Sequence, residues 1–340
     1  MKILNPIIPV SRPNCQASSW KNLLKTAIND PFKLLQKVSV DPQVLDFQLS
    51  EKSSFATRVP QPFIDKIEQG NPRDPLLLQV LASAQEDTAV TNYSNDPLQE
   101  NQTQQPGLLH KYKGRLLLIL ASACAVNCRY CFRRHFPYQD KMASGTQLEN
   151  ALEYIASNQT ISEVILSGGD PLMLGDESLK ALSKRLAEIP HLKRLRIHTR
   201  LPIVIPQRIT QELCEILGNT PLDCSMVLHI NHANEIDRLL IDAVTQLRQA
   251  GVTILNQSVL LKGINDSVEV LNNLSESMFS AGILPYYLHI LDKVSGAAHF
   301  DTPLETAKGL IAQMRHDLPG YLVPRLAIEE PGLAAKTIIA

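Results

Sequence analysis

The chain has 340 residues, of which 44% are hydrophobic, and its formal net charge at pH 7 is −1. This length allows one large α/β domain with an accessory segment. A chain so close to neutral creates no general field that would attract nucleic acid or an anionic membrane surface. No apolar run reaches the ~18 residues of a transmembrane helix and the first residues lack the layout of a signal peptide, so we expect a cytoplasmic protein with no nucleic-acid or membrane partner.

The first part of the chain predicts a helical segment followed by a polar connector. Apolar residues recur at helical spacing within residues 20–28 and again within 31–38. We interpret these helices as a packing cap over the main domain. Residues 86–106 are rich in Asp, Asn, Ser and Gln, which indicates a connector. The predicted division is therefore 1–106 for the helical cap and connector, and 107–340 for the main domain.

Strand-like and helix-like patterns alternate regularly from Arg115 onward. The first apolar run, 116–121, is unbroken, as expected for a strand that is buried on both faces. Further strands are predicted at 163–166, 195–198, 226–230, 252–261 and 285–291, and helices at 147–156, 179–189, 211–217, 235–250, 268–281 and 304–318. Six βα units in succession imply a parallel sheet.

An open doubly wound sheet and a barrel both satisfy this alternation, so the placement of polar residues decides between them. Cys124 follows the first strand, residues 167–170 the second, Asn231 and His232 the fourth, and Asp292 the sixth. Functional side chains at the C-terminal ends of many strands are typical of barrels. Because there are six units rather than eight, we predict an incomplete (βα)6 barrel with a lateral opening.

Three of the six cysteines, Cys124, Cys128 and Cys131, lie close together after the first strand with C-x3-C-x2-C spacing. Three thiolates suit a [4Fe–4S] cluster, because they leave one of its four irons open to a small molecule. A disulfide is disfavoured in a chain without a secretory signal. Structural zinc is the next alternative, although it needs a fourth ligand and the other cysteines are isolated in the sequence, at Cys15, Cys214 and Cys224.

Two further groups of residues suit ligands, and each has a plain structural alternative. The glycine pair in residues 167–170 would let a ligand approach the backbone, but an ordinary βα turn explains it equally well. Lys111, Arg115 and the amide pair at 256–257 offer donors that suit a phosphate. Taken alone, those donors would fit a solvated surface better.

The cysteine motif, C-x3-C-x-aromatic-C with Tyr130 before the last cysteine, resembles the signature of radical S-adenosylmethionine (radical SAM) enzymes. Four motifs in the expected order are similar to those of the lysine 2,3-aminomutase family: KYKGR at 111–115, CRYCFRR at 128–134, SGGDPL at 167–172 and NQSVLL at 256–261. The resemblance extends from about Arg58 to Lys336. It is closest to the short form that makes β-lysine for the modification of elongation factor P.

The resemblance implies an incomplete radical SAM barrel and three cofactors: a [4Fe–4S] cluster, SAM and pyridoxal 5′-phosphate (PLP). The three cysteines would hold the cluster, and its open iron would chelate the methionine part of SAM. Ser167 and Asp170, with the backbone of Gly168 and Gly169, would meet the amino group of SAM. Reduction of the cluster by a partner such as flavodoxin or ferredoxin would then release a 5′-deoxyadenosyl radical.

The resemblance also assigns residues to PLP and to the substrate. Lys336 would form a Schiff base with the PLP aldehyde, although from the sequence alone a lone lysine so near the end would suggest a mobile tail. A lysine substrate needs a cation for its carboxylate and an acid for its distal ammonium. The residues implied are Lys111, Arg115, Asn256 and Gln257 for the PLP phosphate, Arg133 for the substrate carboxylate, and Asp292 with Glu329 for the ε-ammonium.

The chain departs from the family pattern at three of these places. Lys111 replaces an arginine, which keeps the charge but loses the guanidinium fork. Glu329 replaces an aspartate, and the adjacent Glu330 leaves the register open at this point. Residues 333–335, Leu-Ala-Ala, replace a glycine-rich turn before Lys336.

We predict an isomerase that converts L-α-lysine to β-lysine, in which the radical abstracts a β-hydrogen and the amino group migrates on PLP. The product would serve the β-lysylation of elongation factor P, with its lysyl ligase as a functional partner. Ser267 stands where longer catabolic enzymes have a zinc-binding cysteine, and the chain ends at Ala340 without their extra C-terminal segment. Both features favour the short form.

Two alternatives remain open at this point. The first is a free-standing aminomutase that acts on lysine or another amino acid in metabolism. Glutamate is disfavoured as its substrate, because Asp292 would repel an acidic side chain. The second alternative is a non-catalytic Fe–S protein that senses iron or redox state and has no use for Lys336.

Overall fold

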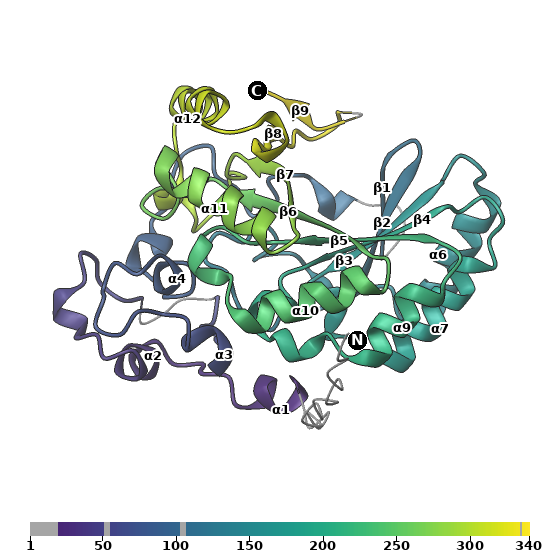
Figure 1. Cartoon of the computed structure of the whole chain (residues 1–340), viewed down its shortest axis with the longest axis horizontal. Coiled ribbons are helices and arrows are strands. Elements are labelled where there is room, and N and C mark those ends of the chain that lie inside the picture. The colour runs from purple at the N-terminus through teal and green to yellow at the C-terminus, as the bar shows by residue number, and fades with distance from the viewer. Residues whose placement is uncertain (1–19, 51–54, 103–106, 334) are drawn as a thin grey trace, which may run out of the picture.

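The computed structural model describes residues 20–50, 55–102, 107–333 and 335–340 of the chain. Its centre is a nine-stranded sheet whose strand order follows the chain from β1 to β9 (Figure 1). Strands β2 to β8 are parallel, whereas β1 and β9 pair antiparallel at the two edges. The strands are β1 Leu108–Tyr112, β2 Arg115–Ala121, β3 Glu163–Gly168, β4 Arg194–Thr199, β5 Asp223–Leu228, β6 Thr253–Val259, β7 Leu284–His289, β8 Arg325–Ile328 and β9 Thr337–Ile338.

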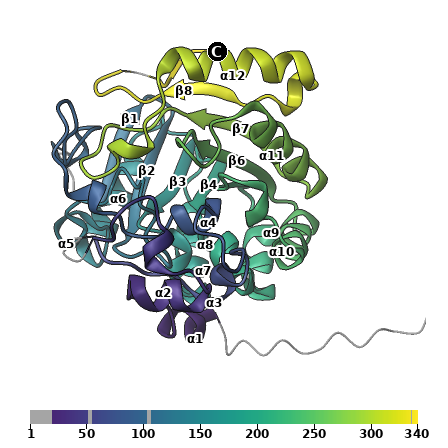
Figure 2. The same ribbon diagram turned by 90° about the vertical axis from the view of Figure 1, so that its left-hand side faces the viewer.

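The uninterrupted strand order decides between a doubly wound sheet and a barrel. A doubly wound sheet reverses its strand order at a switch point. Here every parallel connection steps to the next strand in the same direction, and right-handed connections of this kind place the helices on one face. Figure 2 shows the sheet curving inside a layer of helices. Because β1 and β9 do not pair with each other, the barrel is incomplete, and the predicted fold is confirmed.

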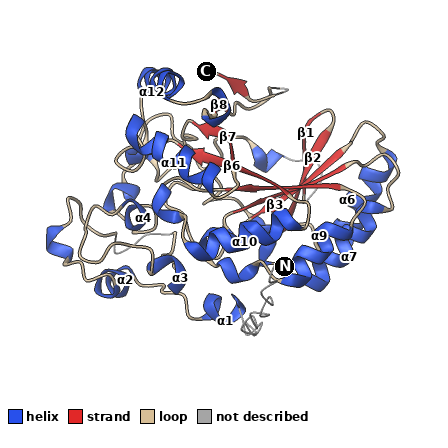
Figure 3. Ribbon diagram, in the orientation of Figure 1, coloured by secondary structure: helices blue, strands red, loops and turns tan. Residues whose placement is uncertain are grey.

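Six βα units run from β2 to α12, in the predicted order (Figure 3). The sequence patterns do not predict β1, β8 or β9, which are short and lie at or near the sheet edges. No helix in the described ranges is long and apolar enough to cross a membrane. The helices of the barrel are α5 Tyr138–Lys141, α6 Thr146–Ser157, α7 Asp176–Ala187, α8 Leu201–Val204, α9 Gln211–Asn219, α10 Arg238–Gln249, α11 Val268–Ser280 and α12 Leu304–Asp317, with 3-10 helices η4 Pro171–Met173, η5 Pro206–Arg208, η6 Ala233–Glu235, η7 Ala298–Phe300 and η8 Gly320–Leu322.

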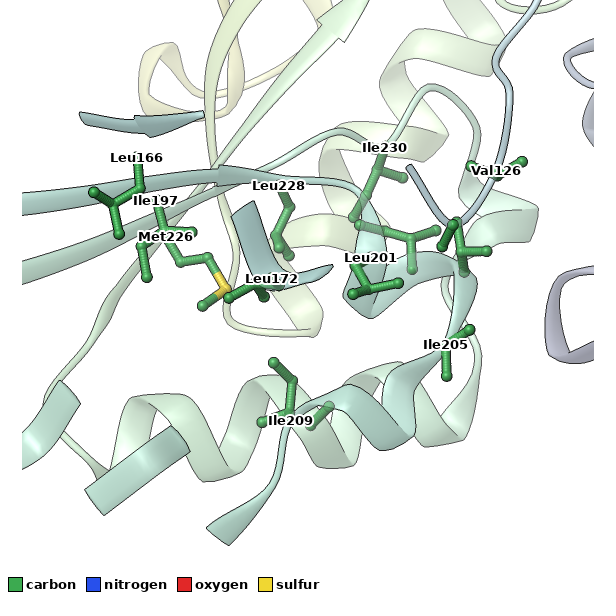
Figure 4. Close-up of a cluster of buried hydrophobic side chains, with 14 of the residues drawn as sticks. Val126, Leu166, Leu172, Ile197, Leu201, Ile205, Ile209, Met226, Leu228 and Ile230 are labelled. Carbon is green, nitrogen blue, oxygen red and sulfur yellow. The ribbon is translucent and has the colours of Figure 1, made fainter. Parts of the chain in front are cut away.

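The core between the sheet and its helices is aliphatic. Leu166 on β3, Ile197 on β4 and Met226 on β5 are register neighbours and lie side by side in Figure 4. Each is almost completely buried, and burying such a side chain contributes about 1.5–3 kcal/mol. The alternate residues Ile165 and Arg196 face the interior of the barrel, where they line a cavity. One face of these strands therefore packs against the helices, and the other face lines the cavity.

The N-terminal elements pack against the barrel. Trp20, Leu34 and Phe63 belong to the same buried cluster as Leu166 and Ile197 of the barrel strands. The two predicted helices are present over shorter ranges, and the proposed division after residue 106 stays a prediction. The elements are α1 Trp20–Lys25, α2 Pro31–Lys37, α3 Gln61–Ile64, α4 Pro75–Leu78, η1 Pro42–Val44, η2 Ala84–Asp87 and η3 Glu100–Gln102.

Candidate functional site

One cavity at the C-terminal ends of the strands brings together nearly all of the predicted site residues. Their gathering at this end is the arrangement typical of barrel enzymes. Asn256 is the predicted residue that does not line it. The predicted residues that do are Lys111, Arg115, Cys124, Cys128, Cys131, Arg133, Ser167, Gly168, Gly169, Asp170, Gln257, Asp292, Glu329 and Lys336.

The cysteine loop follows β2 directly, and all three of its cysteines are free and line the cavity. Burial is the main cause that raises the pKa of Cys124 well above its usual value and that of Cys131 to about 11, and neighbouring thiols add to this by repulsion. Within the described ranges, no group of three or more His, Cys, Asp or Glu residues is arranged to hold a metal ion. Three thiols on one loop suit a cluster in which each thiolate binds a different iron.

Residues from the N-terminal segment hold the cysteine loop in place. Arg129, between the second and third cysteines, has no exposed surface and donates from Nε to Glu86 at 2.7 Å. Arg134 donates to the same carboxylate at 2.6 Å, and the backbone N–H of Arg129 donates to the carbonyl of Gln79 at 2.9 Å. Burial would raise the pKa of Glu86, but the two arginines lower it. This segment therefore supports the site as well as covering the barrel.

The glycine pair joins the end of β3 to the start of the cysteine loop. A Cβ on Gly169 would lie 2.4 Å from the carbonyl oxygen of Ala123, so a side chain has no room there. The N–H groups of Gly169 and Asp170 donate to the carbonyls of Ala121 and Ala123 at 2.7 and 3.0 Å. The close approach that these glycines permit is between two segments of the protein, and it holds the end of β3 against the start of the cysteine loop.

Asp170 has a structural role in the fold, and its predicted contact with SAM stays a prediction. Its carboxylate accepts from the Thr199 hydroxyl at 2.7 Å and from the backbone N–H groups of Arg200 and Leu201 at 2.8 and 2.9 Å. It also accepts from the N–H of Leu172 at 3.0 Å. Both oxygens are engaged and the side chain is buried. Asp170 therefore ties β3 to β4.

Five side chains of alternating charge form a row along the cavity wall, which we call the ion row: Arg133, Glu100, Lys111, Glu329 and Lys336. Arg133 donates from Nε and Nη2 to Glu100 at 2.7 and 3.1 Å. Lys111 donates to Glu100 at 3.0 Å and to Glu329 at 3.3 Å, and Glu329 also pairs with Lys336. Burial would raise the pKa of Glu329, but the lysine charges lower it to about 2. Glu329 is therefore ionised and already paired.

Asp292 is the unpaired acid of the cavity. It follows β7, and its carboxylate has no hydrogen-bond or ion-pair partner in the part of the chain that the structure describes. Burial is the main cause that raises its pKa to about 7, and the negative charge of Glu329 adds to this. The charged form of such a half-buried acid is stabilised by a cationic ligand.

The residues predicted for a phosphate separate into two groups. Arg115 lines the cavity, lies 4.1 Å from the ring centroid of Tyr112, and has no carboxylate partner among the described residues. Gln257 also faces the cavity, with its amide nitrogen 2.8 Å from Nε2 of His229. Asn256 points to the opposite face of β6, where its side chain bonds to the backbone N–H and C=O of Ile230 at 2.8 and 3.0 Å. This corrects the predicted role of Asn256, because neighbouring residues on a strand face opposite sides.

Comparison with known proteins agrees with this geometry. The family model described as Radical SAM superfamily matches residues 118–274. An L-lysine 2,3-aminomutase from Haemophilus influenzae is 50% identical and aligns over 100% of both chains. That of Escherichia coli is 48% identical over 97% of this chain and 96% of its own length, and that of Clostridium subterminale is 36% identical over 81% and 66%. The chain belongs to the L-lysine 2,3-aminomutase family.

The predictions of a radical SAM protein and of an isomerase are thereby confirmed. Radical SAM lysine 2,3-aminomutases use a [4Fe–4S] cluster, SAM and PLP, so the three predicted cofactors are those of the family. The cavity fits them through its donor groups. It offers three thiols, the guanidinium of Arg115 without a carboxylate partner, and the amine of Lys336.

Several residues of this cavity could not be predicted from a sequence motif. His198, His229 and His289 come from three strands or strand ends, and burial is the main cause that lowers the pKa of each, to about 3 for His229 and His289. They are therefore neutral donors or acceptors at pH 7. Their inward positions near the ends of strands could have been found from the strand alternation. Glu100 carries no such signal, because it lies among the polar residues of the connector.

Arg200, which follows β4, links the cysteine loop to the barrel. Its Nη1 donates to the sulfur of Cys128 at 3.2 Å. Its Nη2 donates to Gln79 at 2.9 Å and to Glu235 at 3.1 Å. Arg200 therefore holds the cysteine loop against Gln79 of the N-terminal segment and Glu235 of η6.

Proposed function

We propose that this protein converts L-α-lysine to β-lysine in a PLP-dependent reaction that SAM initiates. The observation that carries the proposal is a single cavity that holds three thiols, a buried arginine, a lysine amine and a half-buried acid without a side-chain partner among the described residues. Each group suits a different participant in such a reaction. A protein that only bound a cluster would need the thiols alone.

Three sets of residues would hold the cofactors. When bound, the cluster and SAM supply an organic radical, and PLP supplies an aldehyde that reacts with amines. The cysteines would bind the cluster, and Ser167 with the backbone of 168–169 would face SAM. Arg115, Lys111 and Gln257 offer donors to the phosphate of PLP.

Selectivity for lysine follows from the two charged ends of the substrate. Its α-carboxylate needs a cation with a defined orientation, and Arg133 is held by Glu100 and by the hydroxyl of Ser167 at 3.1 Å. Its distal ammonium needs an acid, and Asp292 is half-buried, lines the cavity and has no side-chain partner among the described residues. A charge-assisted bond of this kind contributes about 1.5–3 kcal/mol. Glutamate would place its second carboxylate against Asp292 and be repelled.

Glu329 pairs with Lys336 in the structure, yet it is also proposed to bind the ε-ammonium of the substrate. Both roles are possible if they occur one after the other. In the free protein the Lys336 ammonium pairs with Glu329. An ammonium is not a nucleophile, so Lys336 must lose a proton before it reacts with an aldehyde. Once that positive charge is lost, Glu329 becomes available to the ε-ammonium of the substrate, together with Asp292.

We further propose that the β-lysine serves the β-lysylation of elongation factor P in the cytoplasm, with its lysyl ligase as a functional partner and flavodoxin or ferredoxin as reductant. The support is the resemblance of the motifs to the short form of the family. Ser267 adds to it, because its hydroxyl caps α11 by accepting from the N–H of Val270 at 3.4 Å. A helix cap therefore stands where the longer enzymes carry a zinc ligand.

The test is anaerobic incubation of the reconstituted protein with SAM, a reductant, PLP and carbon-labelled lysine. We expect labelled β-lysine by mass spectrometry only when all components are present. A cluster with normal absorbance but no product would favour the Fe–S sensor, and turnover of glutamate would favour a different aminomutase. Adding elongation factor P and its ligase tests the downstream role, because a product that is not attached points to free-standing metabolism.

A further inference from the structure

Glu100 stands between two cationic parts of the cavity. It lies on η3 in the connector, and 4% of its surface is exposed. Its Oε2 accepts from Nε of Arg133 at 2.7 Å. Its Oε1 accepts both from Nη2 of Arg133 at 3.1 Å and from Nζ of Lys111 at 3.0 Å. Burial would raise the pKa of Glu100, but these two cations lower it, so the side chain is an anion at pH 7.

The hydrogen bonds of Arg133 leave part of its guanidinium open. A guanidinium has five N–H donors, one on Nε and two on each terminal nitrogen. Glu100 uses Nε and one donor of Nη2, and the hydroxyl of Ser167 uses one donor of Nη1 at 3.1 Å. One N–H on each terminal nitrogen has no partner among the described residues, and two such donors are sufficient for two hydrogen bonds to a carboxylate. Glu100 and Ser167 thus orient Arg133 without saturating it.

The charge of Glu100 also separates Arg133 from Lys111. Both cations contact the same carboxylate oxygen, so without Glu100 they would form one continuous cationic surface. A phosphate and a carboxylate would then compete for the same donors. A fixed anion between the two cations repels any ligand anion that bridges them, which directs each anion to its own side.

We infer that Glu100 is a positioning residue that determines anion specificity: it orients Arg133 toward the substrate α-carboxylate and keeps this subsite separate from the phosphate subsite at Lys111 and Arg115. This inference rests on the proposed function, because it assumes that an amino acid and a phosphate-bearing cofactor share the cavity.

The test compares lysine with lysinamide, which lacks the carboxylate. Binding of each is measured at equilibrium on the anaerobic, reconstituted protein, for the wild type and for Glu100→Gln, which keeps the size of the side chain. We expect lysine affinity to fall about tenfold or more, because the charge-assisted bonds that orient Arg133 are lost. Lysinamide affinity should change less than about threefold. Inorganic phosphate should compete with lysine in the variant at concentrations that leave the wild type unaffected.

Two further variants separate this role from a general loss of structure. Asp176→Asn is the matched control, because Asp176 pairs with buried Arg208 at 2.7 Å outside the cavity and should change neither ligand's affinity. Glu100→Asp keeps the charge on a shorter side chain, so it should still exclude phosphate while binding lysine with intermediate affinity. Equal losses for lysine and lysinamide, or no loss for either, would overturn the inference. An absence of β-lysine from the wild type would instead count against the proposed function, since the binding comparison needs no turnover.

Discussion

The two ends of the cavity are held in different ways. At one end, Arg129 of the cysteine loop is fully buried and bonded to Glu86, which comes from a distant part of the chain. At the other end, Lys336 immediately precedes the two-residue strand β9, and its amine is held by the ion pair with Glu329. Nearby Leu333 is 48% exposed. The cysteine loop is anchored by a buried ion pair, whereas the lysine is attached through an edge strand.

The difference matches what each end has to do. A cluster ligand keeps its partner throughout a reaction, so a rigid surrounding helps it. An amine that forms and releases a bond in each turnover must be able to move and to exchange its charge partner. We therefore expect changes near the cysteines to affect cluster and stability together, and changes at Lys336 to remain local.

The largest effect is expected from the cysteines themselves. Replacing Cys124, Cys128 or Cys131 with Ala should abolish the Fe–S absorbance and the cleavage of SAM, because each thiolate would bind a separate iron in the proposed cluster. Absorbance spectra and assays for 5′-deoxyadenosine measure both. The control variants are Cys214→Ala and Cys224→Ala, which should behave as the wild type; Cys15, expected to tolerate the same change, lies outside the described residues. Turnover in any of the first three variants would contradict the assignment.

Lys336→Ala should remove the linkage to PLP and leave the iron–sulfur cluster intact. The variant should lose the reducible linkage to PLP and all aminomutation, because no other amine replaces it. The cluster and its binding of SAM should persist, since those groups lie on earlier strands. Borohydride reduction followed by peptide mapping measures the linkage directly. A phosphopyridoxyl label on another lysine, or none on the wild type, would show that the family residue was carried over to the wrong position.

Glu86→Gln sharpens the comparison by measuring stability. It leaves the buried guanidinium groups of Arg129 and Arg134 with an uncharged partner, and losing one member of a buried ion pair costs about 3–5 kcal/mol. Glu329→Gln, at the lysine end where about a fifth of each paired side chain is exposed, should cost less than Glu86→Gln, because the remaining charges there can still be solvated. Chemical denaturation of both variants gives the two free energies of unfolding. Equal costs would mean that the two ends are supported alike.

Much of the fold could be predicted because its strands and helices carry strong local patterns. The run 116–121 is apolar without interruption, and α10 and α11 have clear apolar faces and capping side chains at Asp237 and Ser267. β9 could not be predicted, because two residues carry no periodic signal and its pairing with β8 is a tertiary contact. The same reasoning explains why β1 escaped prediction, since its burial changes along its length.

Site residues that belong to a sequence motif could be predicted. Residues whose role depends on the direction in which the side chain points were harder to predict. Gln257 faces the cavity and Asn256 does not. The two residues are adjacent on β6, and adjacent residues of a strand point to opposite faces of the sheet. Asp170 lies at the expected place, but its acceptors are used within the protein. Glu100 and Glu86 escaped because their roles depend on arginines more than 30 residues away along the chain. The sequence near each glutamate contains no pattern that would predict such a distant contact.

The smallest expected effect is a pH dependence of lysine binding, and it tests the charges at the lysine end. The pKa of Asp292 is raised to about 7 by burial and by Glu329, whereas that of Glu329 is lowered to about 2, so only Asp292 changes its charge near neutrality. The protonated form of Asp292 cannot attract an ammonium, so lysine affinity should fall about tenfold per pH unit below about pH 7 and level off above it. Equilibrium binding between about pH 5.5 and 8.5 measures this, and Asp292→Asn should bind lysine weakly with no such step. A step that survives in Asp292→Asn would assign the titration to a different group and move the recognition of the ε-ammonium away from Asp292.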